Sequence, residues 1–320
     1  MTKTLFIVFA IAIVLAHSLF SQNLTTVWQT ESISEINREP MHASYFVFES
    51  KEVALQNDWQ NSANYLNLNG RWKFNWVESP AKAPKDFYAV NFDDSKWDDF
   101  KVPATWEVHG YGYPIYVNIK YEFEHLMKPD PPQVPVDYNP VGSYRRKITI
   151  HKNWSGKEIF IHFGSAKSNL FVWVNGEFAG YGEDGKLPSE FNITKFVKAG
   201  ENVIAFQVYR WSDGTYLECQ DMWRVSGVTR DCYIYARHPV HLRDFEVTPD
   251  LDENYQNGSL QIKTSFTNAQ QGTNYSLEVE LLDSSATKHQ SSHKLESLAD
   301  KPMLINIDNP LKWTVETPPN

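Results

Sequence analysis

Residues 170–180 read Leu-Phe-Val-Trp-Val-Asn-Gly-Glu-Phe-Ala-Gly, so an Asn-Gly pair stands between two apolar runs. This pattern predicts a β-hairpin, because a type I′ turn needs positive φ at both central residues and Asn-Gly tolerates it. The flanking Val, Phe and Trp side chains favour strands. We therefore expect an antiparallel hairpin at this point of the chain.

The segments around this hairpin have the same character. Residues 71–76 alternate polar and aromatic side chains, as a half-buried strand does. Further short strands are expected at residues 148–150, 159–163 and 203–208. Gly and Pro separate these segments, and no long amphipathic helix is evident. Many short strands with frequent turns are typical of an all-β sandwich or jelly roll.

A domain boundary is expected near residues 237–239. Evenly spaced strands follow it, at residues 241–249, 259–267, 275–282 and 303–307. This spacing suits an immunoglobulin-like sandwich, although some eighty residues are few for one. The last residues contain no terminating signal, so we expect the natural protein to continue beyond them.

Composition narrows the functional classes. The chain is 42% hydrophobic and 22% charged, which excludes a disordered tail. Its formal net charge is −9 without a Lys/Arg-rich run, which argues against a nucleic-acid partner. Aromatic residues make up 14% of the chain. Trp106, Trp211 and Trp223 could stack on sugar rings, although packing in the core is the more ordinary role.

The N-terminus predicts export. Lys3 precedes an apolar run over residues 5–16, and the small residue Ser21 lies in a plausible cleavage zone. The run is too short for a spanning helix, so we expect a signal peptide, no stable membrane insertion and a periplasmic or secreted protein. An uncleaved anchor is the alternative.

The only two cysteines, Cys219 and Cys232, could pair in an oxidising compartment. Two buried thiols are an equally good interpretation, since the sequence does not give their geometry.

Four stretches carry a family resemblance. They are LNGRWKF at residues 68–74, VPATWEVHGY with PIYVN at 102–118, NPVGSYRR at 139–146, and a long run over 187–231 that contains RWSDGTYLE, QDMWR and SGVTRD. Together they resemble the β-galactosidases of glycoside hydrolase family 2, the bacterial lactose-splitting type. The likeness extends from about Trp28 to the end of the chain.

The resemblance implies a domain order. To the signal peptide over residues 1–21 and an extended, weakly patterned arm over 22–60, the resemblance adds a jelly-roll sugar-binding domain over 61–238 and a truncated immunoglobulin-like sandwich over 239–320. A catalytic (β/α)8 barrel should follow. Retaining glycosidases use two carboxylic acids, and in this family both are glutamates of that barrel. We therefore expect no catalytic residue in this chain, and no hydrolysis by it alone.

The resemblance also implies binding residues. Asn118 and Asp221 match family positions that contact the galactosyl unit, and Asp221 matches a ligand of a sodium ion beside the sugar. Without the family, Asn118 would be a plain turn residue, and Asp221 could simply pair with Arg224 or Arg230.

A second metal ion, Mg²⁺ or Ca²⁺, is implied more weakly. Asp213 matches one of its ligand positions, and Glu183 could lie near it. Thr30 stands where the family usually has Asn, which puts this site in doubt. Most ligands of both ions are expected in the barrel.

The partners implied are a β-galactoside or oligosaccharide substrate and further copies of the chain. The arm resembles a segment that stabilises subunit interfaces in related enzymes; a flexible linker is the alternative. A different functional class also fits the strands and aromatic residues, namely a free-standing exported carbohydrate-binding protein without hydrolase activity.

Overall fold

The computed structural model describes residues 24–270, 273, 275–282, 288–295 and 302–316, the side chains of 288–295 excepted. The predicted signal peptide, residues 1–21, lies outside the described residues. The chain divides into two compact units. Unit 1 comprises Met1–Pro40 and Val47–Ala236, and unit 2 comprises Met41–Phe46 and Arg237–Asn320.

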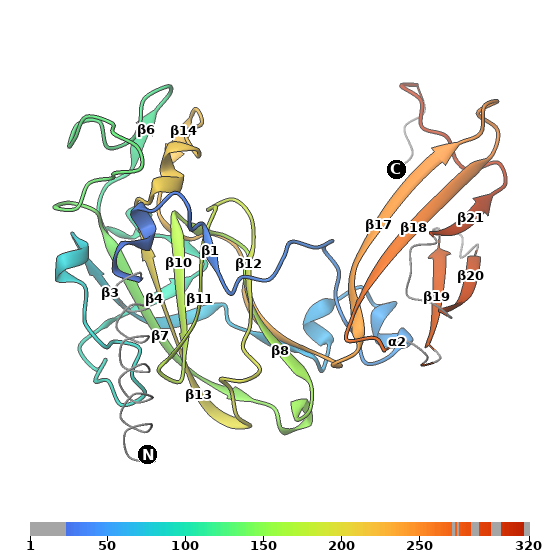
Figure 1. Cartoon of the computed structure of the whole chain (residues 1–320), viewed down its shortest axis with the longest axis horizontal. Coiled ribbons are helices and arrows are strands. Elements are labelled where there is room, and N and C mark those ends of the chain that lie inside the picture. Colours follow the sequence, from blue (N-terminus) through green and yellow to red (C-terminus); the bar gives the residue numbers. More distant parts are fainter. Residues whose placement is uncertain (1–23, 271–272, 274, 283–287, 296–301, 317–320) are drawn as a thin grey trace, which may run out of the picture. The chain divides into compact units, whose positions relative to one another are not determined.

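Unit 1 is built on two antiparallel sheets, whose strands Figure 1 shows in colours from blue through green and yellow to light orange. The larger sheet has the order β1 (Glu35–Ile36), β11 (Glu177–Glu183), β10 (Asn169–Val174), β13 (Gly200–Tyr209), β7 (Val141–Ile150), β3 (Gly70–Val77) and β4 (Asp98–Val102). The smaller sheet has the order β12 (Ser189–Asn192), β8 (Glu158–Phe163), β16 (Cys232–Arg237) and β2 (Tyr65–Asn67).

Shorter elements surround this sandwich. Two further small sheets are β5 (Ala104–Thr105) with β15 (Gly227–Val228) and β9 (Ala166–Lys167), and β6 (Ile115–Val117) with β14 (Met222–Arg224). The helical turns are α2 (Lys51–Ala54), η1 (Val27–Gln29), η2 (Trp59–Asn61), η3 (Pro80–Lys82), η4 (Glu107–His109), η5 (Lys152–Trp154) and η6 (Asp213–Tyr216).

The predicted hairpin is β10 and β11. Asn175 and Gly176 have φ of 52° and 90°, as the turn requires. The Asn175 side chain also fixes the neighbouring strand, because its Nδ2 donates to the carbonyl of Phe196 at 2.8 Å and its Oδ1 accepts from the amide of Val203 at 2.9 Å. The hairpin is therefore held by its turn chemistry and by side-chain contacts.

The larger sheet is buried on both faces. Val172 and Val174 of β10 belong to the core between the two sheets, whereas Phe171 and Trp173 belong to a second core on the opposite face. This alternation follows from the period of two residues in a strand. It also explains why β10 contains no exposed residue and reads as a continuous apolar run.

The N-terminal arm covers part of the second core. Val27 and Trp28 are buried there, and β1 pairs with β11, with Ile36 opposite Tyr181. The arm is thus packed on its own chain and contains short helices besides extended segments. Whether it also contacts another copy of the chain stays a prediction.

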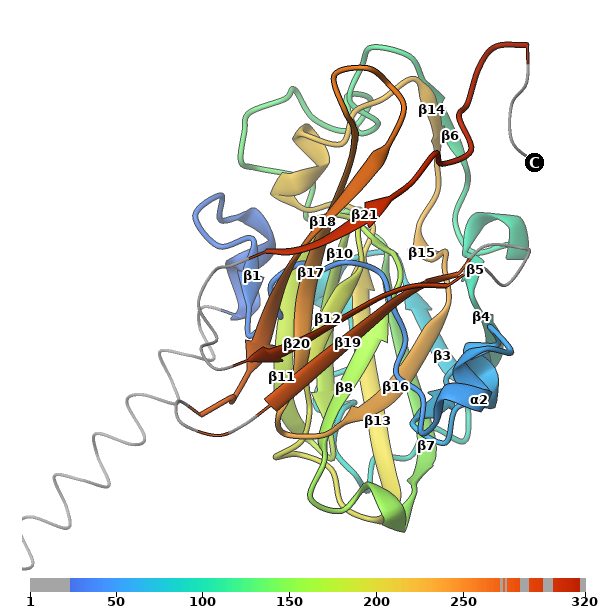
Figure 2. The same cartoon turned by 90° about the vertical axis from the view of Figure 1, so that its right-hand side faces the viewer.

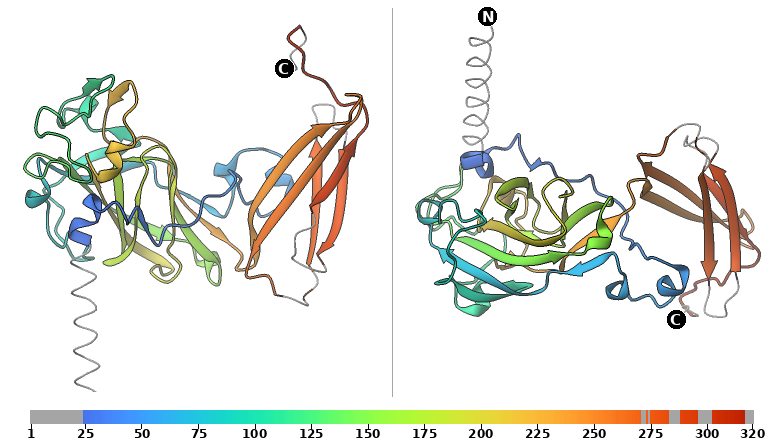
Figure 3. Two further views of the ribbon diagram at one scale, coloured as in Figure 1. Left: turned by 45° about the horizontal axis from the view of Figure 1, so that its top comes forward. Right: turned by 90° about the horizontal axis from the view of Figure 1, so that it is seen from below.

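Unit 2 consists of β17 (His241–Leu251), β18 (Gly258–Thr267) and β21 (Met303–Ile307) in one sheet, and β19 (Tyr275–Leu282) with β20 (Lys288–Leu295) in another (Figure 3). Its core contains Ile262, Met303 and Ile305. From the arm, the amide of Ala43 donates to Asp244 at 2.7 Å.

The predicted all-β class, a jelly roll followed by an immunoglobulin-like sandwich, is confirmed. The described residues form no (β/α)8 barrel. Within the same residues, no helix has the length and apolar character that crossing a bilayer would require.

Candidate functional site

A two-stranded ribbon brings the two predicted sugar contacts together. In the β6–β14 ribbon, Met222 pairs with Val117 and Trp223 pairs with Tyr116. Continuing this antiparallel register by one residue places Asp221 opposite Asn118. Figures 1 and 2 show β6 and β14 side by side at one end of unit 1. The prediction that Asn118 and Asp221 act together therefore has a geometric basis, although their sugar contacts stay a prediction.

We call the face of the ribbon that carries Tyr116 and Trp223 the outward face; on the opposite face Met222 is also exposed, at 41%. Because side chains alternate along a strand, Tyr116 and Asn118 share a face with Asp221 and Trp223. All four residues are exposed. Arg224 points to the other side and is only 2% exposed. The outward face thus combines an amide, a carboxylate and two aromatic rings.

Asp221 has a different partner from those expected on the sequence alone. Its Oδ1 accepts a hydrogen bond of 2.5 Å from the Tyr116 hydroxyl. That bond, with the charge of the carboxylate, raises the pKa of Tyr116. Arg224 donates instead to the carbonyls of Glu218 and Gln220, and Arg230 donates to the carbonyl of Lys186. The carboxylate therefore lies on the exposed face of the ribbon, where it can accept hydrogen bonds from sugar hydroxyls.

A buried charge network lies where the ribbon strands return to the sandwich. Lys167 Nζ donates to Glu122 Oε1 at 3.0 Å. Arg210 bridges two acids, with its Nε 3.8 Å from Glu122 Oε2 and its Nη1 3.8 Å from Glu107 Oε1. Each of these four side chains is at most 9% exposed. Two cations thus balance two carboxylates in a dry environment.

The network holds both strands of the ribbon. Glu122 follows Asn118 by four residues, and Glu107 accepts two hydrogen bonds, of 3.1 and 2.9 Å, from the amide of Ser226, two residues after Arg224. Burial raises the pKa of Glu107, and the Ser226 amide and Arg210 partly offset this. No sequence pattern indicated the network, because its members are distant along the chain.

The structure also joins Glu183 and Asp213. Burial, together with the nearby negative charge of the Asp213 carboxyl, raises the pKa of Glu183 to about 8. The Tyr181 hydroxyl donates to Glu183 as well. Burial raises the pKa of Asp213, whose Oδ1 is buried without a hydrogen-bond partner. The charge of each carboxyl group therefore opposes ionisation of the other.

These groups suit a hard cation in part. Carboxylate oxygens are the ligands that Mg²⁺ and Ca²⁺ prefer, and a bound cation would displace the proton of Glu183. The Thr30 amide donates to the carbonyl of Val27 at 3.1 Å, and the Thr30 hydroxyl donates to the carbonyl of Thr26 at 2.9 Å, so neither group points a free oxygen at the two acids. Among the described residues, no cluster of three or more His, Cys, Asp or Glu side chains could hold a metal ion. Glu183 and Asp213 alone make an incomplete site.

The tryptophan and cysteine residues singled out from the sequence differ in their exposure to solvent. Trp106 and Trp211 are 1% and 0% exposed, so both belong to the core, whereas Trp223 is 61% exposed. Cys219 and Cys232 are free thiols, and burial raises the pKa of Cys232 far above its ordinary value.

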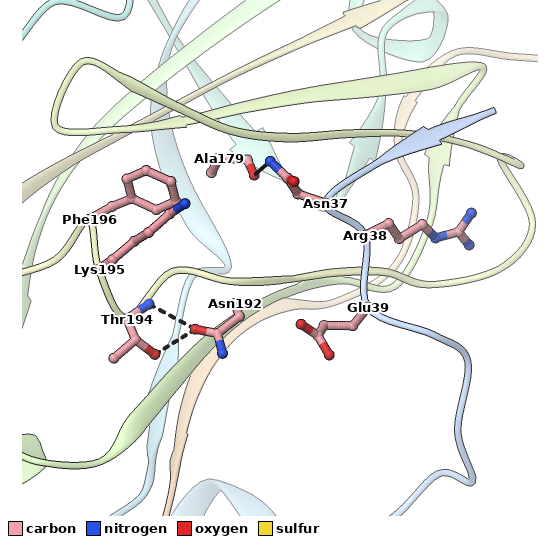
Figure 4. A pocket seen from close by; sticks show the side chains of 8 residues that line it. All are labelled: Asn37, Arg38, Glu39, Ala179, Asn192, Thr194, Lys195 and Phe196. Atoms are coloured by element: carbon pink, nitrogen blue, oxygen red, sulfur yellow. Dashed lines mark hydrogen bonds between the residues drawn. The ribbon is translucent and has the colours of Figure 1, made fainter. Parts of the chain in front are cut away.

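A cavity of about 480 Å³ opens where the arm crosses β11 and the segment after β12 (Figure 4). Asn37, Asn192, Thr194, Lys195 and Phe196 contribute to its lining. Asn192 accepts hydrogen bonds from both the amide and the hydroxyl of Thr194. Sequence reasoning missed this cavity, because the arm forms one of its walls.

Comparison with known proteins identifies the domains. Residues 65–238 match the model "Glycosyl hydrolases family 2, sugar binding domain", and residues 240–319 match the model "Glycosyl hydrolases family 2". The fold is therefore that of the non-catalytic β-sandwich domains of a glycosidase. The chain belongs to glycosyl hydrolase family 2.

Several curated relatives are named β-galactosidase. The protein of Priestia megaterium is 39% identical over 89% of this chain, and that of Halalkalibacterium halodurans is 35% identical over 90%. In each case the chain spans only 28% of the relative's length.

Solved structures share the fold at lower identity. A β-glycosidase from Bacteroides vulgatus has a TM-score of 0.59 at 20% identity, covering 79% of this chain and 30% of its own. The β-glucuronidase of Ruminococcus gnavus has a TM-score of 0.60 at 16% identity, covering 86% and 41%.

Proposed function

We propose that this chain is the N-terminal part of an exported, retaining β-galactosidase that removes terminal non-reducing β-D-galactose from β-galactosides. The observation that supports the proposal is the register of the β6–β14 ribbon, because continuing it by one residue brings the exposed Asn118 and Asp221 opposite each other. The relatives named β-galactosidase, at 39% and 35% identity, support the choice of sugar.

The role of the chain in this proposal is to bind and orient the sugar. The Asn118 amide can donate to one hydroxyl and accept from another, and the Asp221 carboxylate accepts from one or two more. Once a sugar hydroxyl is removed from water, a missing partner costs about 1–3 kcal/mol. Two fixed groups therefore select the positions of several hydroxyls. The two acids that cleave the bond belong to the remainder of the protein, and this chain alone is inactive.

The charge of the outward face also favours a neutral sugar. Of its four residues, Asp221 is the charged one, and its carboxylate would repel the carboxylate of a glucuronide. A neutral galactosyl unit meets no such repulsion. This separates the proposed substrate from that of the β-glucuronidases, whose likeness to this chain at 16% identity concerns the fold alone.

Cations complete the proposed site. Asp221 would supply one oxygen ligand to a sodium ion beside the sugar, and Glu183 with Asp213 would hold a second ion, Mg²⁺ or Ca²⁺. A bound cation supplies positive charge that fixes nearby oxygen atoms. Binding there requires loss of the proton of Glu183, so Glu183 and Asp213 would bind a cation more weakly as pH falls below about 8.

The decisive experiment compares the chain with the longer protein that contains it. The chain alone should not cleave nitrophenyl β-galactoside, whereas the longer protein should cleave it and leave nitrophenyl β-glucuronide intact. Turnover by the purified chain at ordinary enzyme rates, or a longer protein that prefers the glucuronide, would refute the proposal.

A further inference from the structure

We propose that the cavity between the arm and the segment after β12 is a second saccharide site, which binds a short stretch of a neutral sugar chain. None of the eight lining residues belongs to the β6–β14 ribbon or to the buried charge network, so the cavity is separate from the proposed galactose contacts. The inference rests on the proposed function only for the choice of polymer, a β-galactan.

The arm forms one wall of the cavity, and hydrogen bonds attach this wall to the smaller and larger sheets. The amide of Glu39 donates to the carbonyl of Glu190 at 2.8 Å. Asn37 Nδ2 donates to the carbonyl of Ala179 at 3.2 Å. The Arg38 guanidinium donates to two further backbone carbonyls. This wall is therefore fixed on the sandwich although it comes from a distant part of the sequence.

The segment after β12 forms the other wall and has its own supports. The Thr194 hydroxyl donates to Asn192 Oδ1 and accepts from the amide of Ile159 at 2.8 Å. The carbonyl of Phe196 accepts from Asn175 Nδ2 at 2.8 Å. Both walls are thus formed before any ligand binds, as in most small-molecule sites. The volume of about 480 Å³ lies within the usual range of such sites, about 300–1,000 Å³.

The cavity presents donors and acceptors that the chain does not use itself. In the part of the chain that the structure describes, Asn192 Nδ2 and Lys195 Nζ donate no hydrogen bond, and Asn37 Oδ1 accepts none. A sugar hydroxyl both donates and accepts, so one ring can satisfy groups of each kind. Phe196 lies beside Lys195 in Figure 4 and adds an apolar surface for the C–H groups of the sugar.

The charges around the cavity favour a neutral ligand. Glu39 and Lys195 carry opposite charges. The Arg38 guanidinium is bound to backbone carbonyls and points away from the other side chains in Figure 4. An acidic sugar would meet the carboxylate of Glu39, and an amino sugar would meet the ammonium of Lys195. A neutral sugar is repelled by neither group.

A second site would change how the enzyme uses long substrates. Sugar units held in the cavity keep the polymer attached to the protein, which increases the effective concentration of its chain ends at the galactose contacts. A small galactoside cannot occupy both places at once, so its hydrolysis does not depend on the cavity. This difference separates the two sites experimentally.

The test uses the longer protein with two polymers, linear β-galactan, which is neutral, and polygalacturonate, which is acidic. The variant is Lys195→Met, which removes the ammonium donor and keeps an apolar stem beside Phe196. The matched control is Lys198→Met, because Lys198 is exposed on the same segment and does not line the cavity. Binding is measured by retardation in native gels that contain either polymer. For each protein, kcat/KM is measured with galactan and with nitrophenyl β-galactoside, and thermal unfolding is recorded alongside.

We expect galactan, and not polygalacturonate, to retard the wild-type protein. Lys195→Met should weaken galactan binding and lower kcat/KM for galactan about tenfold, the loss that follows from one charged hydrogen bond, with no change for nitrophenyl β-galactoside. Lys198→Met should behave as the wild type. Unchanged galactan binding in Lys195→Met, or retardation by polygalacturonate alone, would overturn the second site. A longer protein that binds galactan through Lys195 but cleaves neither substrate would instead overturn the proposed function and leave the saccharide site in place.

Discussion

Replacing Glu122 with Gln should destabilise unit 1 strongly. The Glu122 side chain is 4% exposed and balances Lys167, which is 9% exposed, and Arg210, which is 1% exposed. Gln has nearly the same shape but no charge, so the variant leaves excess positive charge in a dry site. Breaking a buried ion pair in this way costs about 3–5 kcal/mol. Because Gln can still accept a hydrogen bond from Lys167, we expect a loss of about 3 kcal/mol.

The matched control is Glu201→Gln, which removes an exposed ion pair from the same unit. Glu201 and Lys147 are 3.2 Å apart, with side chains 66% and 68% exposed. Pairs of this kind contribute about 0–1 kcal/mol. Urea unfolding of the chain, followed by tryptophan fluorescence and fitted separately for each unit, measures both variants.

The reasoning is refuted if the free energies of unfolding of Glu122→Gln and Glu201→Gln differ by less than about 1 kcal/mol. A second variant sharpens the test. Glu122→Leu combined with Lys167→Met replaces both charges by apolar groups, and such replacements are often tolerated. The double variant should therefore be more stable than Glu122→Gln, and equal or lower stability would also contradict the account.

Three further predictions concern other parts of the structure. Burial raises the pKa of Glu183 to about 8, above its unfolded value near 4.5, so the stability from its bound proton is complete below pH 4.5 and disappears as pH rises to about 8. Urea unfolding in EDTA, measured from pH 4.5 to pH 8, should show this decrease in the free energy of unfolding. Glu183→Gln should abolish the decrease, and the same pH dependence in the variant would show that Glu183 is not its source. Calorimetry in buffers of different ionisation enthalpy should show proton release when Mg²⁺ binds at pH 6.5, and heats independent of buffer would argue against metal at this carboxyl pair. Gly176→Ala should lower the free energy of unfolding in urea by about 1–2 kcal/mol, because φ of 90° is strained for a residue with a Cβ. Steric contact is not the cause, since an added Cβ would lie no closer than 3.9 Å to another residue. An unchanged midpoint of unfolding would show that the turn relaxes.

Local patterns predicted the sandwich well. The Asn175-Gly176 turn and the alternation in residues 71–76 indicated their strands correctly, because both depend on neighbours in sequence. The pairing of β6 with β14 could not be found in this way. Each strand has three residues, more than a hundred positions separate them, and nothing in either sequence specifies the partner.

The same limit applies to the site. The family motif singled out Asn118 and Asp221, but their placement on one face follows from the register of the ribbon. The contact between Glu183 and Asp213 requires the end of β11 to approach η6, and the buried network requires four segments to converge. Such contacts between distant segments come from tertiary packing, which sequence periodicity does not encode.

The central claim is that the outward face of the β6–β14 ribbon binds the galactosyl unit, and Asp221→Asn in the longer protein tests it most directly. The substitution preserves the shape of an exposed side chain, so thermal unfolding should match that of the wild type. We expect kcat/KM for nitrophenyl β-galactoside to fall about 10- to 100-fold, the loss that follows from about 1.5–3 kcal/mol of charged hydrogen bonding. A kcat/KM within twofold of the wild type, with Glu201→Gln as control, would contradict the claim.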